Sequence, residues 1–161
     1  MFDPVQICTI LNEERVDYVI VGGFAAVVHG SSLPTRDIDV VPSRAPENLE
    51  RLAKALKRMN AMIRTDGEPV PARLDGAFLA NTALMLNLVT DVGEVDLTFA
   101  PSGGLGGFEE WDAHAIVVEI SDGLAVHVAS LDDVIDSKRA ANRPKDQRSL
   151  PYLESLRDQL G

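Results

Sequence analysis

Cysteine and positive charge are scarce in this sequence. Cys8 is the single cysteine among 161 residues, so no disulfide can form within the chain, which fits a reducing compartment and predicts a cytoplasmic protein. Lysine and arginine together number 15 against 25 aspartates and glutamates, which gives a formal net charge of −10. This balance excludes a surface generally adapted to polyanions, so any contact with nucleic acid must come from a local basic cluster.

Long apolar runs and internal repeats are also absent. No stretch approaches the ~20 apolar residues of a membrane span, and the amino terminus has no basic region followed by an apolar one. We therefore expect a protein without a membrane segment or an export signal. With 45% hydrophobic residues, the 161-residue chain is long enough to bury a core, and we expect a single domain over residues 1–161.

Helical and strand patterns alternate along the chain. Apolar positions at helical spacing predict helices over residues 4–15, 24–29 and 45–59. Apolar runs bounded by turn residues predict strands over residues 18–21, 37–41, 84–90, 94–99, 116–120 and 124–128. Residues 101–111, with four glycines, predict a flexible connector or a mobile lid, and the segment from about 130 to 160 returns to helix. The pattern favours an α/β (α+β) fold in which helices flank a mixed β-sheet, with a short C-terminal helical segment.

Two aspartates interrupt an apolar run in the sequence DIDVV, residues 37–41. Side chains alternate between the faces of a strand, so Asp37 and Asp39 share one face while Ile38 and Val40 point into the core. Like charges this close repel one another unless a cation lies between them, which is how Mg²⁺ sites built from a few carboxylates are arranged. The alternative is a pair of solvent-facing acids on a half-exposed sheet.

The strand GEVDLTF, residues 93–99, repeats this pattern. Val95, Leu97 and Phe99 form an apolar face, and Asp96 points to the other side, from which it could join the first pair as a neighbour. Three carboxylates on adjacent strands are suited to holding two Mg²⁺ ions ~4 Å apart, one for a triphosphate and one to activate an attacking hydroxyl. A solvent-facing acid is again the alternative for Asp96.

Two glycines, Gly22 and Gly23, end one predicted strand and open a helix. Such a turn presents backbone N–H groups and the positive end of a helix to an anion, with no side chain in the way. The turn is not a P-loop, because GK[ST] is missing, and GGFAAVVHG lacks the GxGxxG of dinucleotide-binding folds. A dinucleotide site would use Asp39 as its ribose ligand but would leave Asp37 unexplained.

Lys138 falls on the buried stripe of the helix predicted from Ser130, in register with apolar Leu131, Val134 and Ile135. An inward lysine needs an anion, and either a triphosphate or one of the aspartates would serve. Alternatively, its stem packs while its charge reaches solvent. The densest basic cluster of the chain consists of Lys138, Arg139, Arg143, Lys145 and Arg148. It would steer a polyanionic acceptor or bind the nucleotide. Alternatively, it forms a solvated helix face that pairs with Asp136 and Asp146.

Two runs of the sequence resemble known nucleotidyltransferases. GGFAAVVHGSSLPTRDIDVV resembles the signature of the superfamily related to DNA polymerase beta, in which a Gly-Gly or Gly-Ser turn precedes an Asp-x-Asp pair, and Asp96 falls where that superfamily has its third carboxylate. VASLDDVIDSKRAANRPKDQRSLPYLESL is similar to the tail of the AbiEii and MenT group, the nucleotidyltransferase-like toxins of bacterial toxin–antitoxin systems. Gly23 stands where many active members have serine.

The resemblance implies a minimal nucleotidyltransferase fold and the Mg²⁺-dependent transfer of a nucleoside monophosphate from an NTP to an acceptor. It implies metal binding by the three aspartates, phosphate binding by the glycine turn and a catalytic role for Lys138. The spacing KxxxxRPKD adds Asp146 to the nucleotide-binding residues. The residues assigned in this way are Gly22, Gly23, Asp37, Asp39, Asp96, Lys138 and Asp146.

The toxin-like relatives further imply RNA as an acceptor, particularly the 3′ end of tRNA, and a cognate antitoxin protein as a partner. Two alternatives stay open. One is a small-molecule nucleotidyltransferase of the kind that adenylylates antibiotics, which the small size and acidic surface would suit. The other is a nucleotidyltransferase-like domain that binds a partner without catalysing a reaction.

Overall fold

The centre of the molecule is one mixed sheet of seven strands in the order β3-β4-β5-β2-β1-β7-β6. The computed structural model describes all residues, 1–161. Antiparallel pairs are β1 with β2, β3 with β4, β4 with β5, and β6 with β7, whereas β2 with β5 and β1 with β7 are parallel. The strands are β1 (Tyr18–Val21), β2 (Asp37–Pro42), β3 (Met62–Ile63), β4 (Met85–Thr90), β5 (Gly93–Thr98), β6 (Ile116–Ser121) and β7 (Leu124–Val128).

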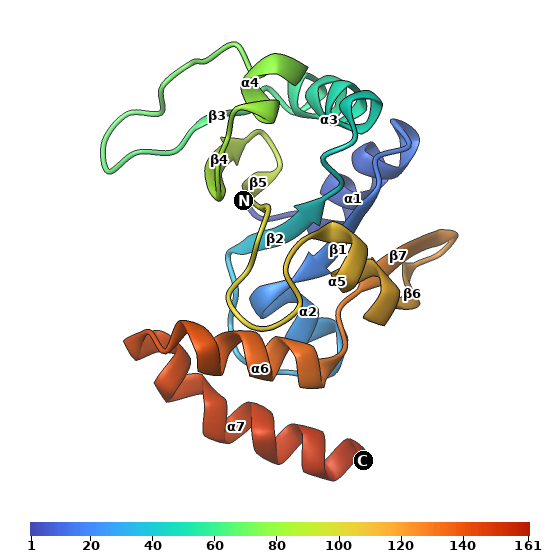
Figure 1. The fold of residues 1–161 in the computed structure, drawn as a ribbon, viewed down its shortest axis with the longest axis vertical. Coiled ribbons are helices and arrows are strands. Elements are labelled where there is room, and N and C mark those ends of the chain that lie inside the picture. Colours follow the sequence, from blue (N-terminus) through green and yellow to red (C-terminus); the bar gives the residue numbers. More distant parts are fainter.

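Helices lie around this sheet, and the last two, α6 and α7, lie together at the end of the molecule away from α3 and α4 (Figure 1). No helix has the length and apolar character needed to cross a membrane. The helices are α1 (Pro4–Glu13), α2 (Gly22–Val28), α3 (Pro46–Arg58), α4 (Gly76–Ala80), α5 (Phe108–His114), α6 (Leu131–Ala141) and α7 (Pro144–Leu160).

The sheet flanked by helices confirms the predicted fold class, and most elements agree with the sequence pattern to within two residues. Ser130 caps α6 as its pattern predicts, because its Oγ accepts a hydrogen bond of 3.1 Å from the backbone N–H of Asp133. Two differences concern glycines. Helix α2 begins at Gly22 rather than after the glycines, and α5 begins inside the segment 101–111, directly after its four glycines.

One cluster of 34 buried apolar residues joins the sheet to the helices. The fully buried Asn48 of α3 links the residue before β1 to the residue after β2. Its Oδ1 accepts a 2.7 Å hydrogen bond from the backbone N–H of Asp17, and its Nδ2 donates to the carbonyls of Asp17 (3.0 Å) and Ser43 (2.9 Å). A buried amide with its hydrogen bonds satisfied fixes how the two strands approach one another.

Candidate functional site

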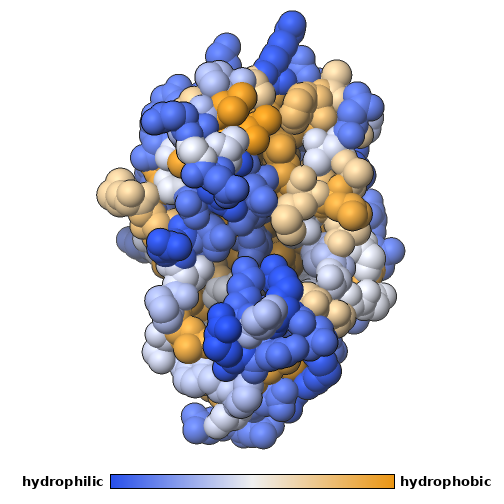
Figure 2. Space-filling model, turned by 90° about the vertical axis from the view of Figure 1, so that its left-hand side faces the viewer, coloured by the Kyte–Doolittle hydropathy of each residue, from blue (hydrophilic) through white to orange (hydrophobic).

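A cleft of about 850 Å³ opens where β1, β2 and β5 meet α6 and the start of α7. Figure 2 shows the face of the molecule on which a hollow crosses its middle, with hydrophilic side chains along it. Among the residues predicted from the sequence, the structure brings Gly22, Gly23, Asp37, Asp39, Asp96 and Lys138 to the walls of this cleft. Asp146 lies behind the wall, fully buried.

The three aspartates meet because β2 and β5 are parallel neighbours. In the register of this pair, Asp39 lies beside Asp96 and Asp37 lies beside Glu94. One carboxylate oxygen from each of Asp37, Asp39 and Asp96 lies within 4.8 Å of the other two. The three acids can therefore touch a single cation at the same time, and their role as metal ligands stays a prediction.

The buried carboxylate of Asp96 tests whether these acids fit a metal ion. Asp96 is 7% exposed, and its Oδ1 accepts no hydrogen bond. Arg64 Nη2 lies 2.8 Å from this oxygen as an ion pair, but its N–H bonds are not directed at it. A buried oxygen with a free lone pair, next to two further carboxylates, fits a hard divalent cation that takes oxygen ligands.

The electrostatics of the cluster also favour a cation. Burial raises the pKa of Asp96 above its ordinary value, and its hydrogen bond to Asp37 and the charge of Asp39 raise it further, against the opposing charge of Arg64. Burial and the charge of Asp37 likewise raise the pKa of Asp39. Asp39 and Asp96 therefore retain protons at pH values where an exposed aspartate has lost them, and a divalent cation would displace those protons.

The glycine turn lies directly against the aspartates. Val21, which precedes it, pairs with Asp39 across β1 and β2. Gly22 has a φ of 69°, and a Cβ atom at this position would overlap the Asp39 carboxylate, so only glycine fits there. At Gly23 a Cβ would lie 3.3 Å from Thr35 Oγ1. The binding of phosphate by these two glycines stays a prediction.

Lys138 has an anionic partner, and this partner is Asp146 rather than one of the three cleft aspartates. Lys138 Nζ lies 3.6 Å from Asp146 Oδ1, and its side chain is 16% exposed. Arg143 Nε lies 2.7 Å from Asp146 Oδ2, and the Arg143 backbone N–H donates to the same oxygen. Burial alone would raise the pKa of Asp146, but Arg143 and Lys138 together bring it below its usual value. In this structure Asp146 therefore positions two cations at the cleft and lines no part of the cleft itself.

The predicted basic cluster divides between the cleft and the outer surface. Arg139 pairs with Asp136 (3.1 Å) and Glu154 (3.2 Å), as expected for a solvated helix face. Lys145 lines the cleft together with Lys138 and Arg143 and forms no ion pair within the chain. Lys138, Arg143 and Lys145 are therefore the members of the basic cluster that face the cleft, where an anionic ligand could contact them.

Sequence reasoning missed two cleft residues. Arg64 is carried by the segment that follows β3, and its place in the site depends on the pairing of a two-residue strand, which leaves no signal in the sequence. Trp111, the sole tryptophan, comes from α5 and forms part of the cleft wall. It is 1% exposed, and its Nε1 has no hydrogen-bond partner.

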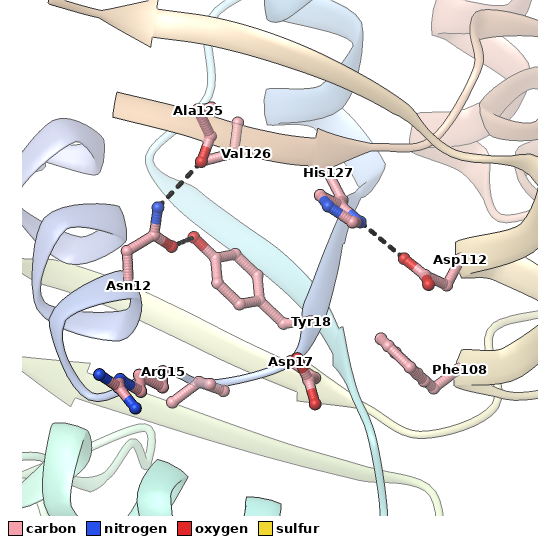
Figure 3. A pocket seen from close by; sticks show the side chains of 10 residues that line it. Asn12, Arg15, Asp17, Tyr18, Phe108, Asp112, Ala125, Val126 and His127 are labelled. Atoms are coloured by element: carbon pink, nitrogen blue, oxygen red, sulfur yellow. Dashed lines mark hydrogen bonds and ion pairs between the residues drawn. The ribbon is translucent and has the colours of Figure 1, made fainter. Parts of the chain in front are cut away.

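A second, smaller hollow of about 340 Å³ lies at the opposite end of β1 (Figure 3). Two pairs of its polar side chains contact one another: the Tyr18 hydroxyl donates to Asn12 Oδ1 at 2.8 Å, and His127 Nδ1 lies 2.7 Å from Asp112 Oδ1. This hollow contains neither a carboxylate cluster nor a glycine turn. The cleft is therefore the candidate site.

Comparison with known proteins adds a family and a fold. The sequence profile of a family described as nucleotidyltransferase of unknown function (DUF6036) matches residues 6–155. No curated protein matches the chain. A crystal structure of TM1012 from Thermotoga maritima, provisionally assigned as a nucleotidyltransferase, superposes with a TM-score of 0.53 over 99% of this chain and 95% of that chain, at 16% identity. JHP933 from Helicobacter pylori is more distant: the TM-score is 0.42 at 14% identity, over 84% of this chain and 53% of that chain.

Proposed function

Because the chain belongs to the DUF6036 family of nucleotidyltransferases, we propose that it transfers a nucleoside monophosphate from an NTP to an acceptor, with pyrophosphate leaving. One observation carries this proposal: carboxylate oxygens of Asp37, Asp39 and Asp96 lie within 4.8 Å of one another in a cleft that also presents free cationic side chains. This combination suits a substrate that brings several negative charges and needs a divalent cation to bind.

In such a transfer, different residues of the chain would bind the metal ion, the phosphates and the leaving group. A Mg²⁺ ion bound by the three aspartates would offset phosphate charge and make an attacking hydroxyl more acidic. The backbone N–H groups at Gly22 and Gly23 would hold phosphate oxygens. Lys138 would offset the negative charge that grows on the leaving pyrophosphate, and Asp146 would hold the Lys138 ammonium group at the cleft wall.

For the acceptor we propose RNA, with the 3′ end of tRNA as the first candidate, in a toxin controlled by a cognate antitoxin protein. The support is the resemblance of the carboxyl-terminal run to the AbiEii and MenT group and the position of two unpaired cations. Arg36 and Lys145 both line the cleft, both are exposed, and neither forms an ion pair. Exposed cations beside a site are how a protein of acidic overall charge would contact a phosphate backbone.

A small-molecule acceptor is the second candidate. A volume of about 850 Å³ is typical of a cleft that encloses a small ligand, and the net charge of −10 would attract a cationic one. An aminoglycoside-like polyamine is such a molecule. The two candidates therefore differ in the charge of the acceptor, which an assay can vary.

The test is to incubate the protein with Mg²⁺ and each α-labelled NTP in turn, with total tRNA, with a panel of cationic small molecules, or alone. We expect label to move to RNA with the wild type and not with Asp39→Asn. Asp122→Asn, an exposed substitution in the turn between β6 and β7, is the matched control and should behave as the wild type. Label on a small molecule would favour the second candidate, a small-molecule acceptor. Absence of label from every acceptor and from the protein itself would contradict the transferase proposal.

A further inference from the structure

Arg64 is the only residue that forms an ion pair with the aspartate triad. Its Nη2 lies 2.8 Å from Asp96 Oδ1, and its side chain is 27% exposed. The backbone fixes where this side chain emerges, because the Arg64 N–H donates to the Asn87 carbonyl at 3.0 Å and Asn87 lies directly across from Asp96 in the β4–β5 pair. The fold itself therefore places the Arg64 guanidinium beside the aspartate triad.

The same guanidinium has a second carboxylate within reach. Arg64 Nη1 lies 3.5 Å from Glu94 Oε2, and the Glu94 side chain is 39% exposed. Glu94 and Asp96 lie two residues apart on β5, so their side chains share one face of the sheet. Arg64 can leave Asp96 and still keep a negatively charged partner in the same cleft.

Charge balance limits how many metal ions this arrangement accepts. The charge of one divalent cation plus one guanidinium equals that of three carboxylates, so the triad with Arg64 is neutral with a single metal ion. A second divalent cation near Asp96 would lie close to a guanidinium in a partly buried place, where like charges repel strongly. An arginine side chain keeps its positive charge in proteins, so the guanidinium must move to relieve this repulsion.

We propose that Arg64 takes the place of a second metal ion at Asp96, so that the nucleotide-free protein holds one divalent cation and accepts a second only after the guanidinium has shifted to Glu94. The inference rests on the proposed function, since it concerns metal binding by the same three aspartates. Arg64 is then a positioning residue. It keeps Asp96 oriented while the site has no nucleotide, and it remains beside Glu94 when a nucleotide brings its own cation.

The experiment measures Mn²⁺ binding to the nucleotide-free protein by isothermal titration calorimetry and by the loss of the free Mn²⁺ signal in electron paramagnetic resonance. We expect one Mn²⁺ per wild-type chain. In Arg64→Gln we expect a second Mn²⁺ to bind, with its affinity raised on the order of tenfold or more because the competing charge is gone. Arg64→Lys keeps the charge and should stay close to the wild type. Arg73→Gln, an exposed arginine further along the same segment, is the matched control.

The outcomes separate the inference from the proposed function. Two Mn²⁺ ions of similar affinity in the wild type, or one in both the wild type and Arg64→Gln, would overturn the role of Arg64 and leave the transferase proposal standing. Absence of Mn²⁺ binding in all four proteins, each shown by circular dichroism to be folded, would overturn both. If Arg64→Gln does not fold, Arg64→Met, which keeps an unbranched side chain without the charge, takes its place, and a single Mn²⁺ in that variant would overturn the role of Arg64.

Discussion

The backbone of Gly22 lies directly against the carboxylate of Asp39, so the turn and the aspartate pair form one unit. The contact arises because Val21 and Asp39 are cross-strand partners and the chain turns into α2 at the next residue. A Cβ atom at position 22 would occupy the place of Asp39 Oδ2. The glycine turn and the Asp-x-Asp pair, 15 residues apart along the chain, are therefore constrained together.

Replacement of Gly22 by alanine should both destabilise the fold and move Asp39. The positive φ of 69° alone costs an alanine about 1 kcal/mol, and the overlap with the carboxylate adds to this cost. Gly123→Ala is the matched control, because it has a φ of 73° with no neighbouring atom within 4 Å. Urea unfolding should show a larger loss of stability for Gly22→Ala than for Gly123→Ala, and Mn²⁺ binding should weaken only in Gly22→Ala. Equal losses in the two variants would contradict the contact.

The triad should make the metal-free protein less stable as the pH rises. In the unfolded chain an aspartate titrates near pH ~4, whereas burial, helped by Asp37 and Asp39, raises the pKa of Asp96 in the folded chain to about 8. The folded state therefore binds more protons across this window, so this contribution to stability is complete below pH ~4 and is lost as the pH rises through the folded pKa. Unfolding in EDTA at several pH values should show a flatter profile for Asp96→Asn than for the wild type.

Mg²⁺ provides the complementary test of the same carboxylates. At pH 8 it should restore stability to the wild type, because the cation replaces the protons that the triad has lost, and it should not affect Asp96→Asn to the same degree. Parallel pH profiles for the two proteins, or equal Mg²⁺ effects, would show that Asp96 does not titrate in this window.

Loss of Asp146 should cost more than loss of Lys138. Asp146→Ala removes the partner of two cations and the acceptor for the Arg143 backbone N–H, so we expect a loss of about 2 to 3 kcal/mol. Lys138→Met keeps the packed stem and leaves Asp146 paired with Arg143, so we expect about 1 kcal/mol. Thermal or urea unfolding measures both, with the exposed Asp136→Ala as a near-neutral reference. A larger cost for Lys138→Met than for Asp146→Ala would reverse this order of importance.

Substitution of Asn48 should lower the stability of the fold without changing metal binding. Asn48→Ala leaves the Asp17 and Ser43 backbone groups without their partners, for an expected loss of about 2 kcal/mol. Asn48→Asp keeps the acceptor but loses both donated hydrogen bonds, and should be destabilised as well. The exposed Asn81→Ala serves as the control. Wild-type stability in Asn48→Ala would mean that water replaces the amide.

Much of the fold follows from local patterns in the sequence. The alternation in DIDVV and in GEVDLTF assigns Asp37, Asp39 and Asp96 to the polar faces of their strands, and the regular apolar spacing after Pro46 predicts α3. That β2 and β5 are parallel neighbours with Asp39 beside Asp96 is a long-range pairing, which no local pattern fixes. For that step the resemblance to a family supplied what periodicity could not.

Other features depend on tertiary contacts alone. Arg64 reaches the triad only because a two-residue strand pairs with β4, and Asn48 looks like any polar residue near a helix start until β1 and β2 are assembled around it. Helix α5 could not be predicted from its local sequence, because the glycines in front of it predict a connector. Trp111 anchors this helix in the core. In each of these cases the sequence pattern is weak and the packing decides.

The position of Trp111 gives the protein a built-in optical reporter. As the only indole in the chain, it is the source of all tryptophan fluorescence. It lies in the wall of the cleft, and its buried N–H group donates no hydrogen bond. Emission from such a buried, single fluorophore is sensitive to any charge or hydrogen bond that arrives beside it. Ligand titrations can therefore be followed on the unlabelled wild-type chain, one nucleotide or metal at a time.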